Sequence, residues 1–200
     1  MTNRYEILEC ETAYQGFFRL SRYRIRHGLF DGGMSESLTR ELFERGNAVA
    51  VMPYDPARDE VVLVEQFRMG ALEAPRGPWL IEIIAGIIEA GESPEDVAVR
   101  ESIEEADCRL DEMFPVYRYL VSPGGSSEQT ALFCARVDTS EIGGVHGKAD
   151  EGEDIRVHVV PFGQAIEMIE DGSIHSATPI IGLQWLALNR DRLREMWLND

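Results

Sequence analysis

Runs of apolar residues divide the chain into a strand-rich N-terminal segment and a longer segment in which strands and helices follow one another. Residues 4 to 43 hold short strand candidates, among them Phe17 to Arg26, and Asp31-Gly32-Gly33 has the composition of a turn. In the longer segment, apolar runs bounded by turn residues predict six strands. They are Val49 to Pro53, Glu60 to Phe67, Trp79 to Ala85, Pro115 to Leu120, Ala131 to Val137 and Ile155 to Val160.

Helix signals fall between and after these strands. Ser93 suits an N-cap and Pro94 suits the first helical position, so a helix is predicted to begin near residue 94. A second helix is predicted over 163 to 171. A third is predicted to open at Thr178, as a cap followed by proline, and to run toward Trp197. This order of strands and helices predicts an α/β fold in which helices cover a sheet.

The size and composition of the chain are those of a globular enzyme of one domain. Its 200 residues, 44% of them apolar, can bury a substantial core. No apolar run approaches the roughly 18 residues of a membrane span, and the first residues lack the long apolar stretch of a secretory signal. We therefore expect no association with membranes.

The net charge and the cysteines exclude further classes of function. A formal charge of −17 repels nucleic acid, and it also repels anionic nucleotides unless metal ions and a few arginines reverse the local field. The three cysteines, Cys10, Cys108 and Cys134, are odd in number and show no matched spacing. They argue against a disulfide framework or a zinc site and favour structural thiols in the reducing cytoplasm.

The predicted helix after residue 94 gathers carboxylates on one side. At about 100° per residue, Glu101, Glu104 and Glu105 fall within one sector. The opposite side, which we expect to pack, carries Ala98, Val99, Ser102, Ile103 and Ala106. Like charges at i and i+4 destabilise a helix by about 0.2 to 0.5 kcal/mol per pair. The cluster therefore does not serve helix stability, and it indicates a site for a cation. Mg²⁺ prefers such oxygens and completes its shell with phosphates, whereas the alternative is a solvated acidic face.

The cluster is part of a longer motif of residues at fixed spacings. It consists of Gly86, Glu92, Arg100, Glu101, Glu104 and Glu105. The spacing resembles the signature of the Nudix hydrolases, G-x5-E-x7-R-E-U-x-E-E-x-G-U, in which U is a bulky apolar residue. The chain departs from the signature at Ser102, Asp107 and Cys108. Since Asp tolerates the left-handed conformation better than most residues, we expect Asp107 to end the helix at a modest local cost, with the site intact.

The resemblance implies a fold and a division of the chain. The fold is the Nudix α/β/α sandwich, with a mixed sheet and an N-terminal antiparallel strand extension. The extension would occupy residues 1–45 and the hydrolase domain residues 46–200. The family also implies a homodimer in which the N-terminal strands of one subunit reach the substrate pocket of the other, although an ordinary sheet within one subunit explains the composition of these strands equally well.

The resemblance further implies a site for Mg²⁺, with Mn²⁺ as an alternative ion. Its ligands would be the carboxylates of Glu101 and Glu105 and the backbone carbonyl of Ala85. Three residues would support them. Gly86 belongs to the motif, Arg100 would orient neighbouring carboxylates, and Glu104 would supply a shared or water-mediated ligand.

An acid-rich loop, residues 146–154, has glycines where a mobile lid needs them. Mg²⁺ acidifies water less than Zn²⁺ does, so a carboxylate must accept a proton as water attacks phosphorus. The resemblance marks Glu151 as this general base and Glu153 as a further metal ligand, and Glu153 is also the first rival as base. A solvated acidic loop is the alternative. We interpret His146 as a surface or loop-packing residue.

The chain resembles the bacterial ADP-ribose pyrophosphatases of that family over nearly its full length. The residues that carry this likeness form a candidate substrate wall: Phe17, Phe18, Arg40, Glu41, Arg68, Ser122, Pro123, Gly124 and Glu128. Phe17 would stack on adenine, Arg40 and Arg68 would meet the ring and phosphates, and Glu128 would accept hydrogen bonds from ribose. The alternatives are strand core for Phe17 and Phe18, a surface charge for Arg40, and a simple turn at Pro123.

These features together predict Mg²⁺-dependent hydrolysis of ADP-ribose to AMP and ribose 5-phosphate by metal-activated water. A Nudix hydrolase of another nucleoside-diphosphate sugar, such as GDP-mannose, is the nearest alternative, because it would use the same metal site. A catalytically idle sensor that binds ADP-ribose is a further alternative, against which the intact Glu101, Glu104 and Glu105 argue.

Overall fold

The structure is a computed structural model that describes residues 4–199 and consists of two compact units. The first unit comprises the chain up to Asn47 together with Tyr119–Thr130. The second comprises Ala48–Arg118 and the chain from Ala131 onward. Each unit is described by itself below.

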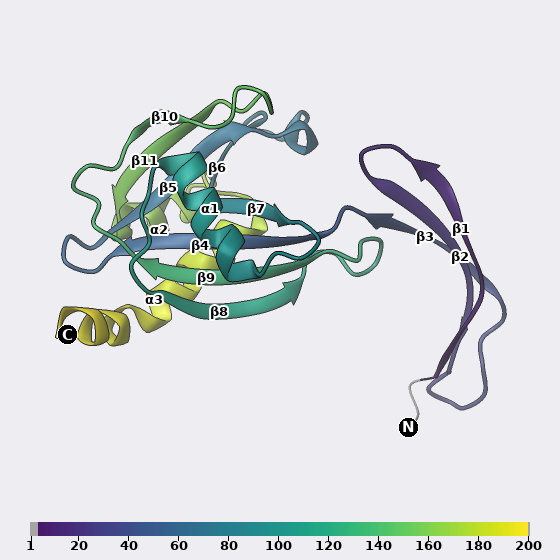
Figure 1. Ribbon diagram of the computed structural model, residues 1–200. Coiled ribbons are helices and arrows are strands. Elements are labelled where there is room, and N and C mark those ends of the chain that lie inside the picture. The colour runs from purple at the N-terminus through teal and green to yellow at the C-terminus, as the bar shows by residue number, and fades with distance from the viewer. Residues whose placement is uncertain (1–3, 200) are drawn as a thin grey trace. The chain divides into compact units, whose positions relative to one another are not determined.

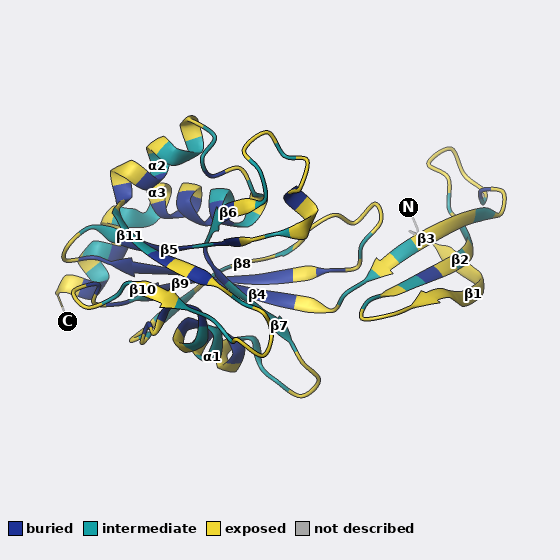
Figure 2. Cartoon of the chain, turned by 90° about the horizontal axis from the view of Figure 1, so that it is seen from above, coloured by how far each residue is buried: buried dark blue, intermediate teal, exposed yellow. Residues whose placement is uncertain are grey.

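The first unit contains an antiparallel sheet of three strands in the order β1-β2-β3. The strands are β1 (Tyr5–Gln15), β2 (Arg19–His27) and β3 (Leu38–Glu44). Every residue of β1 is exposed, as the yellow strand in Figure 2 shows. Cross-strand ion pairs line this sheet, for example Arg22 with Glu11 at 3.1 Å and with Glu41 at 3.3 Å. The sheet is therefore held by backbone pairing and charge pairs, without a covering layer of its own.

The predicted strand over Phe17 to Arg26 is wrong at its start. Strand β2 begins at Arg19, and Phe17 and Phe18 lie in the bend that joins it to β1. The predicted turn after Asp31 is present, because Gly32 and Gly33 adopt φ values of 98° and 80°. Only glycine takes up such angles without strain.

The second unit is built on a sheet in which β10, β11, β5, β4, β9 and β8 are neighbours in that order, while β6 pairs with β5 and β7 with β4. The strands are β4 (Asn47–Asp55), β5 (Glu60–Phe67), β6 (Trp79–Glu82), β7 (Ile84–Ile88), β8 (Met113–Leu120), β9 (Gln129–Arg136), β10 (Gly144–His146) and β11 (Ile155–Pro161). Figure 1 traces their order along the chain.

Three α-helices cover this sheet. They are α1 (Pro94–Ala106), α2 (Phe162–Glu170) and α3 (Ala177–Leu198), and a short 3-10 helix, η1, spans Met69–Ala71. Figure 2 shows α1 on one face of the sheet and α2 with α3 on the other. The predicted α/β/α sandwich is therefore confirmed. No helix within residues 4–199 is both long and apolar enough to cross a membrane.

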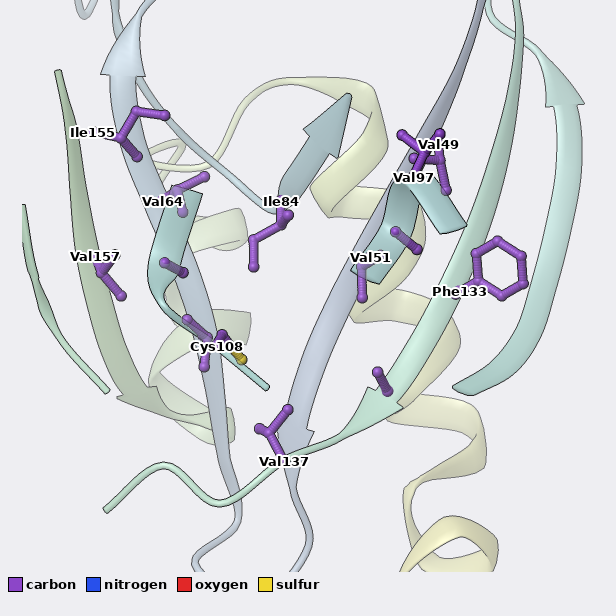
Figure 3. Packing of buried hydrophobic residues seen from close by; sticks show 14 of the residues in the cluster. Val49, Val51, Val64, Ile84, Val97, Cys108, Phe133, Val137, Ile155 and Val157 are labelled. Atoms are coloured by element: carbon purple, nitrogen blue, oxygen red, sulfur yellow. The ribbon is translucent and has the colours of Figure 1, made fainter. Parts of the chain in front are cut away.

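The core between α1 and the sheet comes from alternate residues of the central strands. Val49 and Val51 of β4 and Val62 and Val64 of β5 are fully buried in one hydrophobic cluster. Ile84 of β7 and Val97 and Ala98 of α1 pack in the same cluster, as Figure 3 shows for Ile84 and Val97. Because successive strand residues face opposite sides, this spacing of two directs one side of each strand toward α1.

The predicted elements of the second unit depart from the structure at three places. The single strand predicted over Trp79 to Ala85 is two strands, because β6 pairs with β5 and β7 pairs with β4. The last helix begins at Ala177 with Ser176 as its N-cap, so Thr178 lies inside the first turn and is not the cap. The short strand β10 was not predicted, since three residues carry too little periodicity to reveal a strand.

Candidate functional site

Local signals fix both ends of α1. Ser93 is its N-cap, in an extended conformation, and its hydroxyl accepts a hydrogen bond of 3.1 Å from the Asp96 N–H. Asp107 ends the helix in the left-handed conformation with φ 46°, and its N–H donates to the Ile103 carbonyl at 3.0 Å. The expectation that Asp107 replaces the usual glycine as a left-handed terminator is therefore confirmed.

The face that α1 buries matches the predicted one at Ala98, Ser102 and Ala106 but differs from it at three other positions. Glu105 is only 2% exposed, whereas Val99 and Ile103 are 46% and 41% exposed. The prediction that Glu105 lies on an open acidic side and that Val99 and Ile103 pack is therefore wrong. Ser102, which breaks the apolar pattern, is fully buried and donates to the Ala98 carbonyl at 2.8 Å. This hydrogen bond satisfies the hydroxyl within the helix, so the departure from the motif costs little.

Glu105 is the electrostatic centre of the site. Its carboxylate accepts a hydrogen bond of 3.1 Å from the N–H of Ala85, at the start of β7. Burial raises the pKa of Glu105 to about 8, against the smaller opposing effect of this hydrogen bond. Burial also raises the pKa of Glu101, and the charge of Glu153 contributes to raising both values. Buried carboxylates in this state favour a nearby cation.

Two glycines permit close approach around these carboxylates. A Cβ on Gly86 would lie 2.0 Å from Oε1 of Glu101, so any side chain there would displace this carboxylate. Gly147 has φ 103°, and a Cβ there would lie 2.8 Å from the Cβ of Glu153. Both positions therefore require glycine on geometric grounds.

Arg100 connects three carboxylates of the motif. Its guanidinium donates to Glu101 at 2.9 Å and to Glu104 at 3.1 Å, and lies 3.4 Å from Glu92. The structure thus brings together the residues that the sequence singled out and places Arg100 where it orients them. Charge-assisted hydrogen bonds of this kind hold side chains in defined positions.

The acid-rich loop, residues 146–154, contacts α1. The Gly147 N–H donates to the backbone carbonyl of Glu104 at 3.2 Å. The ammonium of Lys148 lies 2.8 Å from Glu104 and 3.3 Å from Glu151. The Lys148 N–H donates to the carboxylate of Glu153 at 3.1 Å. Lys148 was missed in the sequence, because only the fold places it beside α1.

His146 has a structural contact rather than a chemical partner. Its Nε2 lies 2.7 Å from the carbonyl of Gly143, the residue just before β10. This agrees with the interpretation of His146 as a loop-packing residue.

Arg68 extends the site along β5. Its Nε donates to the carboxylate of Glu82 at 2.7 Å, and its charge acts to lower the pKa of Glu105. Gln66 precedes it on the same face of β5, is 6% exposed, and has a side-chain N–H group without a hydrogen-bond partner among residues 4–199. Glu82 was missed in the sequence, because only the pairing of β5 with β6 places it beside Arg68.

The other candidate substrate residues belong to the first unit. Phe17 is 87% exposed, so strand core is the wrong interpretation for it. Phe18 packs edge-on against Phe43 with ring centroids 5.1 Å apart, and the guanidinium of Arg45 lies 5.9 Å from the Phe18 ring. Arg45 also pairs with the largely buried carboxylate of Glu128 at 3.6 Å. Phe43 and Arg45 are additional members of this cluster that the sequence did not single out.

Five further candidates lie on the surface of that unit. Arg40 is exposed and donates to the carbonyl of Thr39 at 2.8 Å, and Glu41 pairs with Arg22. Ser122 opens a turn in which its carbonyl accepts the N–H groups of Gly125 at 3.1 Å and Ser126 at 2.9 Å. Pro123 and Gly124 are exposed within this turn. The simple turn is therefore present, whatever else these residues contact.

The donor set suits a hard divalent cation. Within residues 4–199, no three His, Cys, Asp or Glu side chains come close enough to hold a metal ion by themselves. Glu101 and Glu105 nevertheless offer two carboxylates of raised pKa beside the backbone of Ala85. Mg²⁺ takes few protein ligands and completes its shell with water and phosphate oxygens. The residues therefore fit this ion, with a phosphate ligand as the natural complement.

The chain is similar to several known proteins. The model of the NUDIX domain matches residues 44–178. An ADP-ribose pyrophosphatase of Escherichia coli is 51% identical over 195 residues, which cover 98% of this chain and 93% of that protein. A GDP-mannose pyrophosphatase of Yersinia pestis is 31% identical, with 94% of each chain covered. A crystal structure of an ADP compounds hydrolase shares the fold, with a TM-score of 0.71 and 18% identity over 98% of each chain.

Proposed function

The chain belongs to the Nudix hydrolase family, and from this premise we propose that it hydrolyses the diphosphate of ADP-ribose to AMP and ribose 5-phosphate with the help of Mg²⁺. The observation that carries the choice of substrate is the high identity with the Escherichia coli ADP-ribose pyrophosphatase over almost the whole chain. The buried carboxylates of α1 support the choice of ion.

The carboxylates of Glu101 and Glu105 and the carbonyl of Ala85 would hold the ion, and Glu153 would join them from the acid-rich loop. When bound, Mg²⁺, or Mn²⁺ in its place, neutralises charge on the diphosphate oxygens and makes water a better nucleophile. Arg100 holds Glu101 and Glu104 in place through hydrogen bonds of 2.9 and 3.1 Å. The ligands would thus be oriented before substrate arrives, which reduces the reorganisation that the reaction requires.

Glu151 would accept the proton of the attacking water. It stands in the loop that Gly147 and Lys148 attach to α1, so its carboxylate is tethered near the acidic residues of that helix. Its side chain is 57% exposed, which suits a group that must pass its proton on to solvent. Glu153 is the rival for this role.

Two residues at the end of β5 would hold the diphosphate, Gln66 within the strand and Arg68 directly after it. Arg68 would contact phosphate oxygens, because its guanidinium keeps donors beyond the one that it gives to Glu82. Gln66 would donate to the same group through its side-chain N–H, which has no hydrogen-bond partner within residues 4–199 and is costly to bury in that state. In the first unit, Phe17 would stack on adenine, and Phe18, Arg40, Glu41, Ser122, Pro123, Gly124 and Glu128 would complete the contacts.

A product assay tests this function. Purified protein is supplied with ADP-ribose, GDP-mannose or a dinucleoside polyphosphate, each with Mg²⁺ and with a chelator. We expect AMP and ribose 5-phosphate from ADP-ribose at a kcat/KM at least tenfold above the other substrates, and no turnover with chelator. Equal or faster cleavage of GDP-mannose would replace the proposed substrate.

Two other functions are tested in the same assay. Hydrolysis of GDP-mannose is favoured by the identity with the Yersinia pestis enzyme, which is lower than that with the Escherichia coli enzyme. An idle sensor would bind ADP-ribose in calorimetry without any turnover that Mg²⁺ stimulates. The retained carboxylates Glu101, Glu104 and Glu105 weigh against this sensor.

We also propose a homodimer in the cytoplasm, in which residues 1–45 take part in dimerisation and substrate contacts. The exposure of all of β1, including the apolar side chains of Tyr5 and Ile7, supports a second subunit as their cover. Cys10, Cys108 and Cys134 are free thiols, as a reducing compartment would keep them. Sedimentation of the full chain should give twice its mass of 22.5 kDa.

A further inference from the structure

Lys148 is the single lysine of this chain, whose other 18 basic side chains are arginines. It stands in the acid-rich loop, residues 146–154, and its ammonium reaches two carboxylates on different elements. It lies 2.8 Å from Glu104 of α1 and 3.3 Å from Glu151 of the loop. Lysine differs from arginine in carrying a compact charge with three rotatable donors on a flexible stem. Such a group can donate to two carboxylates on different elements at once.

The two ends of this bridge differ in how firmly they are held. Glu104 is fixed within α1, because Arg100 donates to the same oxygen at 3.1 Å. Its side chain is 23% exposed, whereas that of Glu151 is 57% exposed. Because the ammonium contacts both groups, it holds the exposed carboxylate of Glu151 close to the fixed carboxylate of Glu104.

The backbone of the loop has its own attachments. The Gly147 N–H donates to the Glu104 carbonyl at 3.2 Å, and the Lys148 N–H donates to Glu153 at 3.1 Å. Both bonds use main-chain donors, so they survive replacement of the lysine side chain. Removing the ammonium should therefore release the Glu151 carboxylate while the loop stays docked on α1.

We propose that Lys148 is a positioning residue for the general base, acting by holding the Glu151 carboxylate against Glu104. This inference rests on the proposed function, since it gives Glu151 the role of base. A partly exposed ion pair contributes little to folding stability, so the contact matters for orientation rather than for the stability of the fold. Misplacing a reacting group even slightly lowers the rate of the chemical step.

Steady-state kinetics with ADP-ribose test this role. We expect Lys148→Met to lower kcat on the order of tenfold with KM within twofold, a smaller loss than the 10² to 10⁴ typical of removing a base outright. Lys148→Arg should recover most of this loss, because it keeps the charge and two donors. An unchanged or increased kcat in Lys148→Met would overturn the proposal, and so would an equal loss in Lys148→Arg.

A matched control and a double variant separate positioning from general damage. Arg136 also pairs with two carboxylates, Asp111 at 3.5 Å and Glu112 at 3.0 Å, outside the site. Arg136→Met should leave kcat and KM unchanged.

In a Glu104→Gln background, Lys148→Met should lower kcat less than twofold, because the carboxylate that anchors the ammonium is already lost. A full tenfold loss in that background would contradict transmission through Glu104.

A readout independent of activity uses the uniqueness of this lysine. Protein labelled with ¹⁵N-lysine has one side-chain ammonium, so its signal in a nuclear magnetic resonance spectrum needs no assignment. In the wild type we expect an ammonium protected from exchange with water, and in Glu104→Gln at least a several-fold faster exchange. Equal exchange in the two proteins would overturn the bridge.

The two kinds of failure can be told apart. If wild-type protein does not hydrolyse ADP-ribose, the proposed function fails, and the ammonium signal still decides whether Lys148 is tied to Glu104. If wild-type protein turns over ADP-ribose while Lys148→Met is equally fast, the positioning role alone fails.

Discussion

The backbone N–H of Ala85 donates a 3.1 Å hydrogen bond to the carboxylate of Glu105, which joins the start of β7 to the buried side of α1. This contact places an acidic side chain, 2% exposed, against the backbone of Ala85, whose carbonyl is a further candidate ligand of the ion. One hydrogen bond does not offset the burial of the charge, and the pKa of Glu105 rises to about 8.

The stability of the metal-free protein should fall as pH rises. The pKa of Glu105 is raised from 4.5 to about 8 on folding, so the folded state binds its proton more tightly than the unfolded state. This contribution is fully present below pH 4.5 and is lost as pH approaches 8. Its size is at most on the order of 5 kcal/mol, since one pKa unit corresponds to about 1.4 kcal/mol.

Urea unfolding between pH 5 and 9 with a chelator measures this slope. Glu105→Gln is the matched control, because its amide keeps an acceptor for the Ala85 N–H but does not titrate. The variant should show a weaker dependence on pH and a higher free energy of unfolding than wild type at pH 9. Parallel curves for the two proteins would show that Glu105 does not titrate in this range.

Gly86→Ala should lower both activity and stability, although it adds only one methyl group. The added Cβ would lie 2.0 Å from Oε1 of Glu101, so the carboxylate must move. We expect kcat/KM for ADP-ribose to fall at least tenfold and the free energy of unfolding to fall by about 1 to 3 kcal/mol, as for other overpacked positions.

Gly163→Ala is the control for this change. Gly163 lies in α2, and nothing is within 4 Å of a Cβ built there. Because alanine favours a helix over glycine, this variant should be as stable as wild type or up to about 1 kcal/mol more stable, with normal activity. Similar activity in the two alanine variants would remove the link between Gly86 and Glu101.

Glu151→Gln and Glu153→Gln should fail in different ways. Loss of the base should lower kcat by about 10² to 10⁴ with KM for ADP-ribose retained. Loss of a metal ligand should instead raise the Mg²⁺ concentration needed for half-maximal rate. Titration of Mg²⁺ at saturating ADP-ribose separates the two. If excess Mg²⁺ restores Glu151→Gln but not Glu153→Gln, the two roles must be exchanged.

Phe17→Ala should weaken substrate binding without destabilising the protein. Phe17 is 87% exposed, so truncation removes little buried area. Loss of a stacking contact should raise KM for ADP-ribose by about three- to tenfold, given the usual value of about 1 kcal/mol for aromatic pairs. Phe30→Ala, at a side chain 96% exposed in the same unit, should change neither KM nor the melting temperature. Equal effects of the two variants on KM would exclude a specific contact at Phe17.

The elements with strong local signals were predicted well. Strand β5 has its predicted bounds of Glu60 and Phe67, and α1 begins at Pro94 after the predicted cap Ser93. Errors arose where pairing decides the outcome. The run from Trp79 to Ala85 is continuous in apolar character, yet it divides because its halves pair with different strands. Phe17 and Phe18 have the residue type of a strand but lie in the bend before β2.

The same division holds for the site. Gly86, Arg100, Glu101 and Glu105 could be singled out because their spacing is fixed along the chain, and the structure brings them together. Lys148 could not, because nothing in the sequence near it indicates a partner 44 positions earlier.

The sequence by itself determined which carboxylates α1 carries, where this helix begins and ends, and the family to which the chain belongs. Caps, helical spacing and motif spacing are local properties that need no knowledge of the fold. Only the tertiary structure decided that Glu105 is buried while Val99 and Ile103 are exposed, and that the acid-rich loop reaches Glu104. Burial and the pairing of distant charges depend on how the sheet packs against α1, and this packing arises from contacts between residues far apart in the chain.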